Sequence, residues 1–185
     1  SGTLQGGINL VNQSTGYFHY LSGSPIDFDD WGTLALINSI EGVGRSWWAL
    51  DYEEHCWVQE TSWDSPSMHT GDMSDRDGGY FDPHTLHQNG LDVDVRYVRH
   101  PGPDSEGENA TLNIANNPER WDTLATVDLL NCWNSSSNNR LNFIYISRLL
   151  YDLLAYPVPP RLIRREFDHF DHFHVQINDP DGPND

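Results

Sequence analysis

The sequence has no lysine, only two cysteines and no long hydrophobic run. A membrane-spanning helix needs about 18 or more consecutive apolar residues, and the sequence contains no such run. The first ten residues, SGTLQGGINL, lack a basic start and an apolar stretch, so they do not predict a signal peptide. Cys56 and Cys132 form no CxxC pair, which argues against a zinc site built on cysteine. One disulfide and two buried thiols remain as alternatives.

The chain is strongly acidic, since 28 acidic residues against ten arginines give it a formal net charge of -18. Such a field repels nucleic acid and anionic lipid, so we expect neither as a partner. A hydrophobic fraction of 37% and seven tryptophans are enough for a packed core. The length of 185 residues predicts one domain over residues 1–185. The sequence leaves the oligomeric state open.

Helices and strands are expected to alternate without a regular β–α–β rhythm, which favours the α+β class. Asp29 and Asp30 suit the N-cap of a helix that begins in WGTLALINSIEGVG, and a second helix is expected from about Pro118. A third helix is expected in SRLLYDLLAY and should stop before Pro157. The expected strands lie within 55–74, at 91–98, at 141–146 and at the end of 167–177.

The stretch HTLHQNGLDVDVR, residues 84–96, concentrates groups that bind metals or carry protons. Apolar and polar residues alternate in its second half, which predicts a half-buried strand with its apolar side toward the core. The other face of this strand presents Asp92, Asp94 and Arg96. His84 and His87 stand in the loop just before it, so histidine and aspartate can converge on one point.

A second cluster, DHFDHFHV, lies near the end of the chain. His172 and His174 share one face of an expected strand, with His169 and Asp171 just before it. Two strands side by side, one giving histidine and aspartate and the other histidine, supply the donors of a zinc site. Calcium is the rival where carboxylates dominate, and a solvated acidic face with structural histidines is the simpler alternative.

The segments GDMSDRDGG, HTLHQNGLDVDVRY and HFDHFHVQI resemble, in this order, the motifs of the penicillin-insensitive murein endopeptidases. That family belongs to a wider group with lysostaphin-type enzymes, D-Ala-D-Ala metallopeptidases and the hedgehog signalling domain. The resemblance runs from about residue 71 to 177. It implies a small antiparallel sheet that carries a zinc site and is flanked by helices.

Residue by residue, the resemblance implies three zinc ligands, which are His87, Asp94 and His174. It makes His172 the catalytic base or proton shuttle and His169 a second catalytic histidine that lines the site. His84 is a possible additional ligand. The spacing from His87 matches Asp94 rather than Asp92, so we expect replacement of Asp92 to leave the acid release of zinc nearly unchanged.

The resemblance further implies a periplasmic or extracellular zinc endopeptidase that hydrolyses D-Ala–diamino acid bonds in peptidoglycan. Its alternatives are a D,D- or L,D-carboxypeptidase of the same group and a non-catalytic, zinc-stabilised binding module. Peptidoglycan peptides are anionic, so the acidic chain would slow their encounter, although less so at high salt. Arg76 and Arg96 are therefore the expected substrate-binding residues, with Arg99 as a third candidate.

Overall fold

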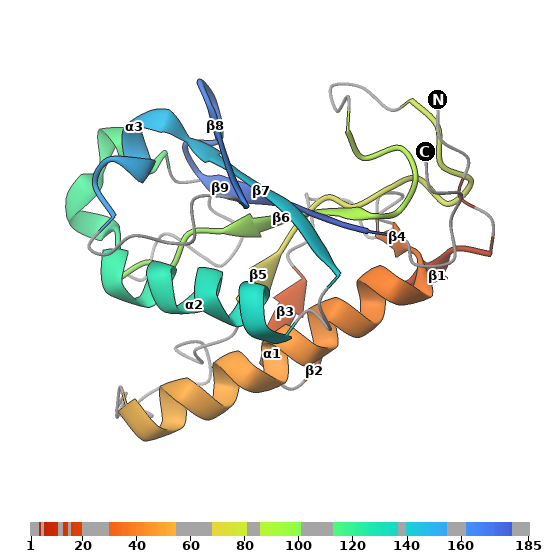
Figure 1. The fold of residues 1–185 in the computed structure, drawn as a ribbon, viewed down its shortest axis with the longest axis horizontal. Coiled ribbons are helices and arrows are strands. Elements are labelled where there is room, and N and C mark those ends of the chain that lie inside the picture. Colours follow the sequence, from red (N-terminus) through yellow and green to blue (C-terminus); the bar gives the residue numbers. More distant parts are fainter. Residues whose placement is uncertain are drawn as a thin grey trace.

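A computed structural model of the chain describes residues 4, 6–10, 13–14, 16–19, 30–54, 68–80, 86–100, 113–136, 140–154 and 162–178. These residues form three α-helices, a seven-stranded sheet and a two-stranded sheet (Figure 1). The mixture confirms the α+β class. No helix among these residues is long and apolar enough to cross a membrane.

The large sheet is mixed rather than purely antiparallel. Its order is β2 (Gln13–Ser14), β3 (Tyr17–His19), β5 (Met68–Thr70), β6 (Asp92–Arg96), β9 (His172–Ile177), β7 (Leu141–Ser147) and β8 (Ile163–Glu166). The four central strands β5, β6, β9 and β7 pair antiparallel, as expected, whereas β3 with β5 and β7 with β8 pair parallel. The small sheet joins β1 (Ile8–Asn9) to β4 (Trp31–Gly32).

The first helix, α1, spans Leu34–Glu54 and is longer than the sequence pattern predicted. Its cap is Thr33, whose hydroxyl accepts a hydrogen bond from the Leu36 amide at 3.2 Å. The prediction of an aspartate cap was wrong for Asp30, which instead forms an isolated β-bridge with Ser74, whereas Asp29 lies outside the described residues. The turn at Gly16 packs directly on the backbone of this helix at Gly44, which leaves no room for a side chain at position 16. A Cβ on Gly16 (φ +83) would lie 1.8 Å from the Gly44 carbonyl oxygen.

The second helix, α2, spans Thr123–Ser136 and begins later than predicted. Pro118–Arg120 form a separate 3-10 turn (η3), and Ile114–Asn116 form another (η2). Asp122 caps α2, because its carboxylate accepts a hydrogen bond from the Ala125 amide at 2.9 Å. The third helix, α3, is a single turn at Arg148–Tyr151, much shorter than the predicted ten residues.

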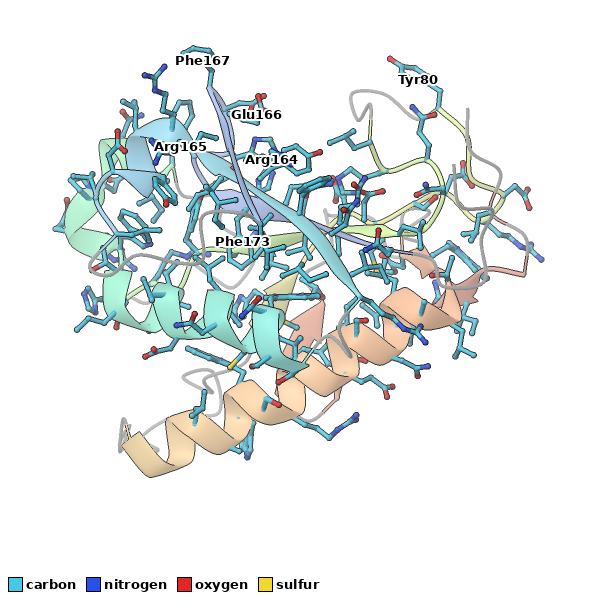
Figure 2. The ribbon with its side chains drawn as sticks, viewed as in Figure 1. Tyr80, Arg164, Arg165, Glu166, Phe167 and Phe173 are labelled. Carbon is cyan, nitrogen blue, oxygen red and sulfur yellow. The ribbon has the colours of Figure 1, made fainter. Side chains whose placement is uncertain are left out.

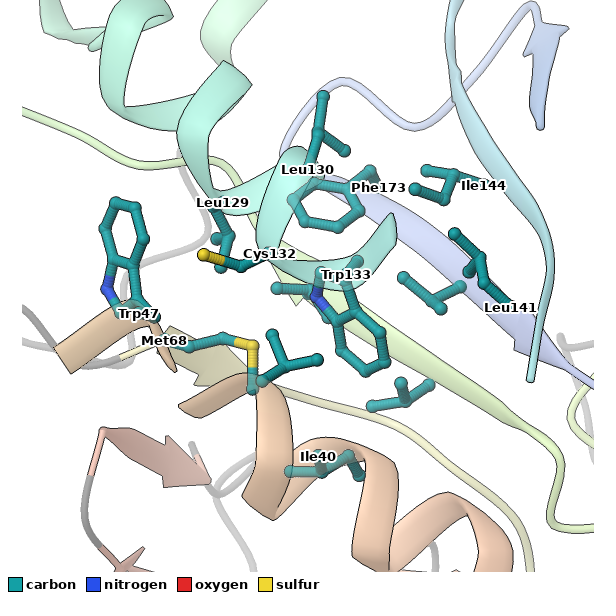
Figure 3. Packing of buried hydrophobic residues seen from close by; sticks show 14 of the residues in the cluster. Ile40, Trp47, Met68, Leu129, Leu130, Cys132, Trp133, Leu141, Ile144 and Phe173 are labelled. Atoms are coloured by element: carbon teal, nitrogen blue, oxygen red, sulfur yellow. The ribbon is translucent and has the colours of Figure 1, made fainter. Parts of the chain in front are cut away.

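Helices α1 and α2 lie against one face of the large sheet (Figure 1). On that face, one apolar row crosses four strands, from Val93 through Val175 and Ile144 to Ile163, as successive registered partners. Figure 3 shows the core that the helices form against this face; its labelled members include Ile40, Trp47, Leu129, Leu130 and Trp133. Burial of each such side chain stabilises the fold by about 1.5–3 kcal/mol.

Cys132 also belongs to this core. It is a free, buried thiol on α2, and burial, with the charge of Asp128, raises its pKa to about 11. This agrees with the buried-thiol alternative for Cys132, whereas Cys56 lies outside the described residues.

Strand β6 corrects the expectation of a half-buried strand, because all five of its residues are buried. The exposed fractions on its polar face are 0% for Asp92, 4% for Asp94 and 6% for Arg96. A buried charge costs several kcal/mol unless partners compensate for it. The partners of these side chains therefore define the site.

Candidate metal centre

Three side chains from distant segments meet on the sheet face opposite α1 and α2. They are His87, Asp94 and His174, all buried, and one ligand atom from each lies within 4.8 Å of the others. Asp94 and His174 are registered partners on the antiparallel strands β6 and β9, so their side chains stand on the same face. The three residues predicted as ligands are thus brought together, and the group could hold a metal ion.

The loop before β6 brings His87 to this group. The loop turns at Gly90 (φ +70), where a Cβ would lie 3.0 Å from the backbone nitrogen of Thr33. The Nδ1 atom of His87 lies 2.7 Å from the carbonyl oxygen of Met73. The segment that contains Met73 is itself held to β6, since the Asp94 amide donates to the carbonyl of Asp72 at 3.0 Å.

The bond to Met73 fixes which nitrogen of neutral His87 carries the proton. A carbonyl oxygen only accepts, so Nδ1 must donate, and the lone pair of the ring is then on Nε2. This Nε2 lies 3.2 Å from Oδ1 of Asp94. A lone pair and a carboxylate oxygen repel each other unless a cation lies between or beside them, and this is the arrangement of two metal ligands.

His174 lies between two aspartates. Its Nδ1 is 3.0 Å from Oδ1 of Asp94, and its Nε2 is 3.0 Å from Oδ1 of Asp92. Burial lowers the pKa of His174, but the hydrogen bonds with Asp92 and Asp94 outweigh it and raise the pKa to about 9. In the absence of metal the ring therefore carries a proton on each nitrogen. A metal ion at the Asp94 side would replace the Nδ1 proton and leave the bond to Asp92 intact.

Asp92 has a role that the sequence did not indicate. Its carboxylate accepts hydrogen bonds from His174 Nε2 and, at 3.0 Å, from Gln176 Nε2. A carboxylate on the outer nitrogen of a ligating histidine fixes the ring and makes it a stronger ligand. The hydrogen bond to His174 predicts that replacement of Asp92 weakens metal binding, in contrast to the expectation from the sequence.

Asp94 is held as a carboxylate. Burial alone would raise its pKa, but the charge of His172 and the hydrogen bond from His174 are among the contacts that hold the pKa well below its usual range. Two imidazole nitrogens and one ionised carboxylate form a donor set that suits zinc and similar divalent ions, with a further coordination position left for water. These residues therefore fit the metal that the sequence motifs imply.

His172 contacts this group from its more open side. Its Nε2 is 3.5 Å from Oδ2 of Asp94, and its Nδ1 is 3.0 Å from Oδ1 of Asp171. Its side chain is 22% exposed, whereas that of His174 is 2% exposed. Burial lowers the pKa of His172, but Asp94 and Asp171 outweigh it, so the pKa is raised. The partner Asp171 was not predicted as a site residue, although it directly precedes His172.

His169 lines the same region without contacting the three grouped residues through a hydrogen bond. Its ring centroid is 5.0 Å from that of His172, and its Nδ1 is 2.6 Å from Oδ1 of Asp168. Its backbone has the left-handed φ of 64°. The hydroxyl of Tyr97 donates to the His169 carbonyl at 3.0 Å and holds this conformation.

The structure gives less direct support for a role of the three predicted arginines and of His84 in the site. Arg96 is buried and is the registered partner of His172 on β6. Arg76 is exposed in a turn, with its guanidinium 5.4 Å from the ring centroid of Trp31. The backbone of Arg99 forms an isolated antiparallel β-bridge with that of Trp121. His84 lies outside the described residues.

Tyr145, on β7, is a further neighbour that sequence reasoning missed. It is the registered partner of His174, and the two ring centroids are 5.4 Å apart in an edge-on arrangement. The alternation in LNFIYI does place Phe143 and Tyr145 on one face. Only the order of the strands places that face beside the histidines, and the sequence does not give this order.

Comparison with protein-family models finds no match to this chain, and comparison with curated proteins finds no matching relative. The motif resemblance and the geometry of the site are therefore the basis for a function.

Proposed function

We propose that the chain is a zinc metallopeptidase of the murein endopeptidase type, acting on peptide bonds of peptidoglycan in the periplasm or outside the cell. The observation that carries the proposal is the buried group of His87, Asp94 and His174 with His172 against its open side. This is the set of residues that the motif resemblance assigns to ligands and base.

In this proposal His87 Nε2, a carboxylate oxygen of Asp94 and His174 Nδ1 hold the ion. When bound, zinc supplies a Lewis acid that lowers the pKa of water and polarises the scissile carbonyl. Met73 and Asp92 orient the two imidazoles through their outer nitrogens. Asp94 supplies the single negative charge among the ligands.

In the proposed reaction, His172 carries the proton from the attacking water to the leaving amine. Asp171 accepts from Nδ1 and so leaves Nε2 as the atom that faces the reacting groups. Nε2 takes the proton of the attacking water as the new carbon–oxygen bond forms. It then gives this proton to the amine nitrogen as the carbon–nitrogen bond breaks.

His169 supports the same step as a positioning residue. Burial and the charge of His172 lower the pKa of His169, although Asp168 and Asp94 oppose the shift. A neutral ring beside His172 permits the latter to take up a proton without a second positive charge next to it.

The decisive experiment combines metal content with turnover. The purified chain, loaded with zinc, is incubated with a cross-linked muropeptide and with the corresponding uncross-linked one, and products are followed by mass spectrometry. We expect about one zinc per chain and cleavage of the cross-link. Release of only a terminal residue would instead identify a carboxypeptidase, and zinc binding without cleavage of either substrate would favour the binding module.

A further inference from the structure

The metal-bearing face of the sheet continues beyond the candidate ligands to the edge of the sheet. Asp94 is registered with His174, His174 with Tyr145, and Tyr145 with Arg164 on the edge strand β8. Registered partners in neighbouring strands stand on the same face. The four side chains therefore form one row, which we call the polar row, running from the metal centre to Arg164.

Arg164 lies within reach of a substrate bound at the metal centre. Strands are spaced about 4.8 Å apart, so the backbones of His174 and Arg164, two strands apart, are separated by about 10 Å. One extended residue spans about 3.3–3.6 Å. A guanidinium on this row can thus contact the first or second residue beyond the scissile bond.

The Arg164 side chain is exposed, yet it is held in place. Its guanidinium carbon is 3.9 Å from the ring centroid of Phe143, which lies on the same face of β7. Stacking occupies a flat face of the guanidinium and leaves the N–H groups at its edges directed outward. Arg164 makes no ion pair with any carboxylate in the described part of the chain.

Its neighbour Arg165 differs in each respect. Strand alternation places it on the other side of β8, as Figure 2 shows. It stacks on Tyr151 at 4.0 Å and pairs with Asp152 at 3.4 Å. Its charge is already matched by a carboxylate, whereas no carboxylate among the described residues pairs with Arg164.

The surrounding charges make this difference significant. The chain carries a net charge of -18, and Glu166 stands on the same face of β8, two residues after Arg164. An anionic substrate is repelled by this surface unless a cation is placed where its carboxylate arrives. Arg96 on β6 is on the same face of the sheet, but it is buried, whereas Arg164 is exposed.

We propose that Arg164 is the specificity residue that binds the carboxylate of the amino acid following the scissile bond. The inference rests on the proposed function and names the substrate group that the site selects. In a cross-link from D-Ala to a diamino dicarboxylic acid and in a C-terminal dipeptide alike, a free carboxylate stands on the carbon that carries the scissile nitrogen. A planar guanidinium binds such a carboxylate through two parallel hydrogen bonds.

The test uses two acyl-peptides that differ only at this group, one with the free carboxylate and one with a carboxamide. Zinc-loaded wild type is expected to prefer the carboxylate by about 10- to 100-fold in kcat/KM, mainly through KM. Arg164→Gln is expected to reduce this preference to about threefold or less. Arg165→Gln, the matched control on the same strand, is expected to retain it.

The same two peptides are also compared by calorimetric binding to zinc-loaded protein carrying His172→Ala, which separates recognition from turnover. Carboxylate-dependent binding that Arg164→Gln abolishes supports the assignment, even where no hydrolysis occurs and the proposed function fails. Hydrolysis without a carboxylate preference, or with a preference that survives Arg164→Gln, overturns the assignment and leaves the peptidase intact. Failure to bind or cleave either peptide overturns both.

Two further pairs of substrates distinguish the two sources of the carboxylate. A linear dipeptide terminus and a side-chain cross-link to a diamino acid are each compared with their carboxamides. A loss of preference on Arg164→Gln with either substrate supports the assignment and tells which source the site uses. A preference independent of Arg164 with both substrates contradicts it.

Discussion

Two rows of side chains cross the same four strands one residue apart. They differ in polarity and in the face of the sheet on which they stand. The apolar row of Val93, Val175, Ile144 and Ile163 faces the helices, while the polar row of Asp94, His174, Tyr145 and Arg164 faces the other side. The apolar row gains free energy by leaving water. The polar row buries a carboxylate and an imidazole, which is favourable only with compensating partners.

Adjacent residues of one strand point to opposite faces of the sheet, and this alternation alone can give them different functions. His174 and Val175 are adjacent on β9, and both are buried. Removal of one should affect metal binding, and removal of the other should affect stability. This separation can be tested directly.

The largest expected effect is on metal affinity. His174→Ala removes one of the three candidate ligands, so the affinity for zinc should fall by about three orders of magnitude or more. Val175→Ala should leave the zinc affinity within about threefold of wild type and destabilise the fold by about 1–3 kcal/mol. Competition with a chromogenic chelator and urea unfolding measure the two quantities. Equal losses of zinc affinity in both variants would show that the rows do not act separately.

The next effect concerns turnover at constant metal content. His172→Ala should retain zinc, because its nearest contact to the ligand group is 3.5 Å from Asp94 Oδ2. Its kcat on a cross-linked muropeptide should fall by about 10²- to 10⁴-fold with loss of the proton carrier. Zinc analysis beside steady-state kinetics gives both readouts. If this variant loses zinc as readily as His174→Ala, then His172 is a ligand and not a base.

The residue types and their spacing on each strand predicted much of this site. Alternation correctly placed Asp92 with Asp94, and His172 with His174, because a strand has a fixed period of two. Pairing of β6 with β9 then brings the two sets together in a register that the sequence suggests but does not fix.

Other features depend on tertiary contacts that no local pattern encodes. The burial of β6 on both faces follows from the segments that cover its polar side, including the Met73 carbonyl that binds His87. The parallel edge strand β8, which carries Arg164, is reached through long connections and was not predicted. The start of α2 depends on whether the helix begins at Pro118 or after a cap at Asp122, and the capping hydrogen bond to Asp122 decides it.

A smaller effect distinguishes the two aspartates of β6. Asp92→Asn weakens the partner of His174 Nε2 but removes no ligand, so zinc affinity should fall by about 10- to 100-fold. Asp94→Asn replaces a charged ligand with a weaker neutral one and should cost more. Protons compete with zinc for the histidines, so the pH at which zinc is released should move upward in both variants, and further for Asp94→Asn. Titration of bound zinc from pH 8 to pH 4 checks the order. An unchanged midpoint for Asp92→Asn would show that the hydrogen bond to His174 does not support the metal.

The smallest expected effect concerns His69 on β5, the strand that pairs with β6 on the edge away from β9. Burial, together with the charges of Arg96 and Arg99, lowers the pKa of His69 to about 4. Unfolding returns the pKa to about 6.5, so the unfolded chain binds more protons between these two values. Stability contributed by the neutral ring is therefore full above about pH 6.5 and is lost as the pH falls toward 4.

His69→Gln removes this titration without changing the metal ligands. Urea unfolding of metal-free wild type and variant at pH 7 and pH 4.5 gives the pH dependence of the free energy of unfolding for each. Wild type should lose on the order of 2 kcal/mol more than the variant over this interval, since one pKa unit corresponds to about 1.4 kcal/mol. Titration of His174 and the aspartates occurs in both proteins and cancels in the difference. If the two proteins lose the same free energy, burial and the two arginine charges do not lower the pKa of His69, and its ring is better hydrated than its position in the fold indicates.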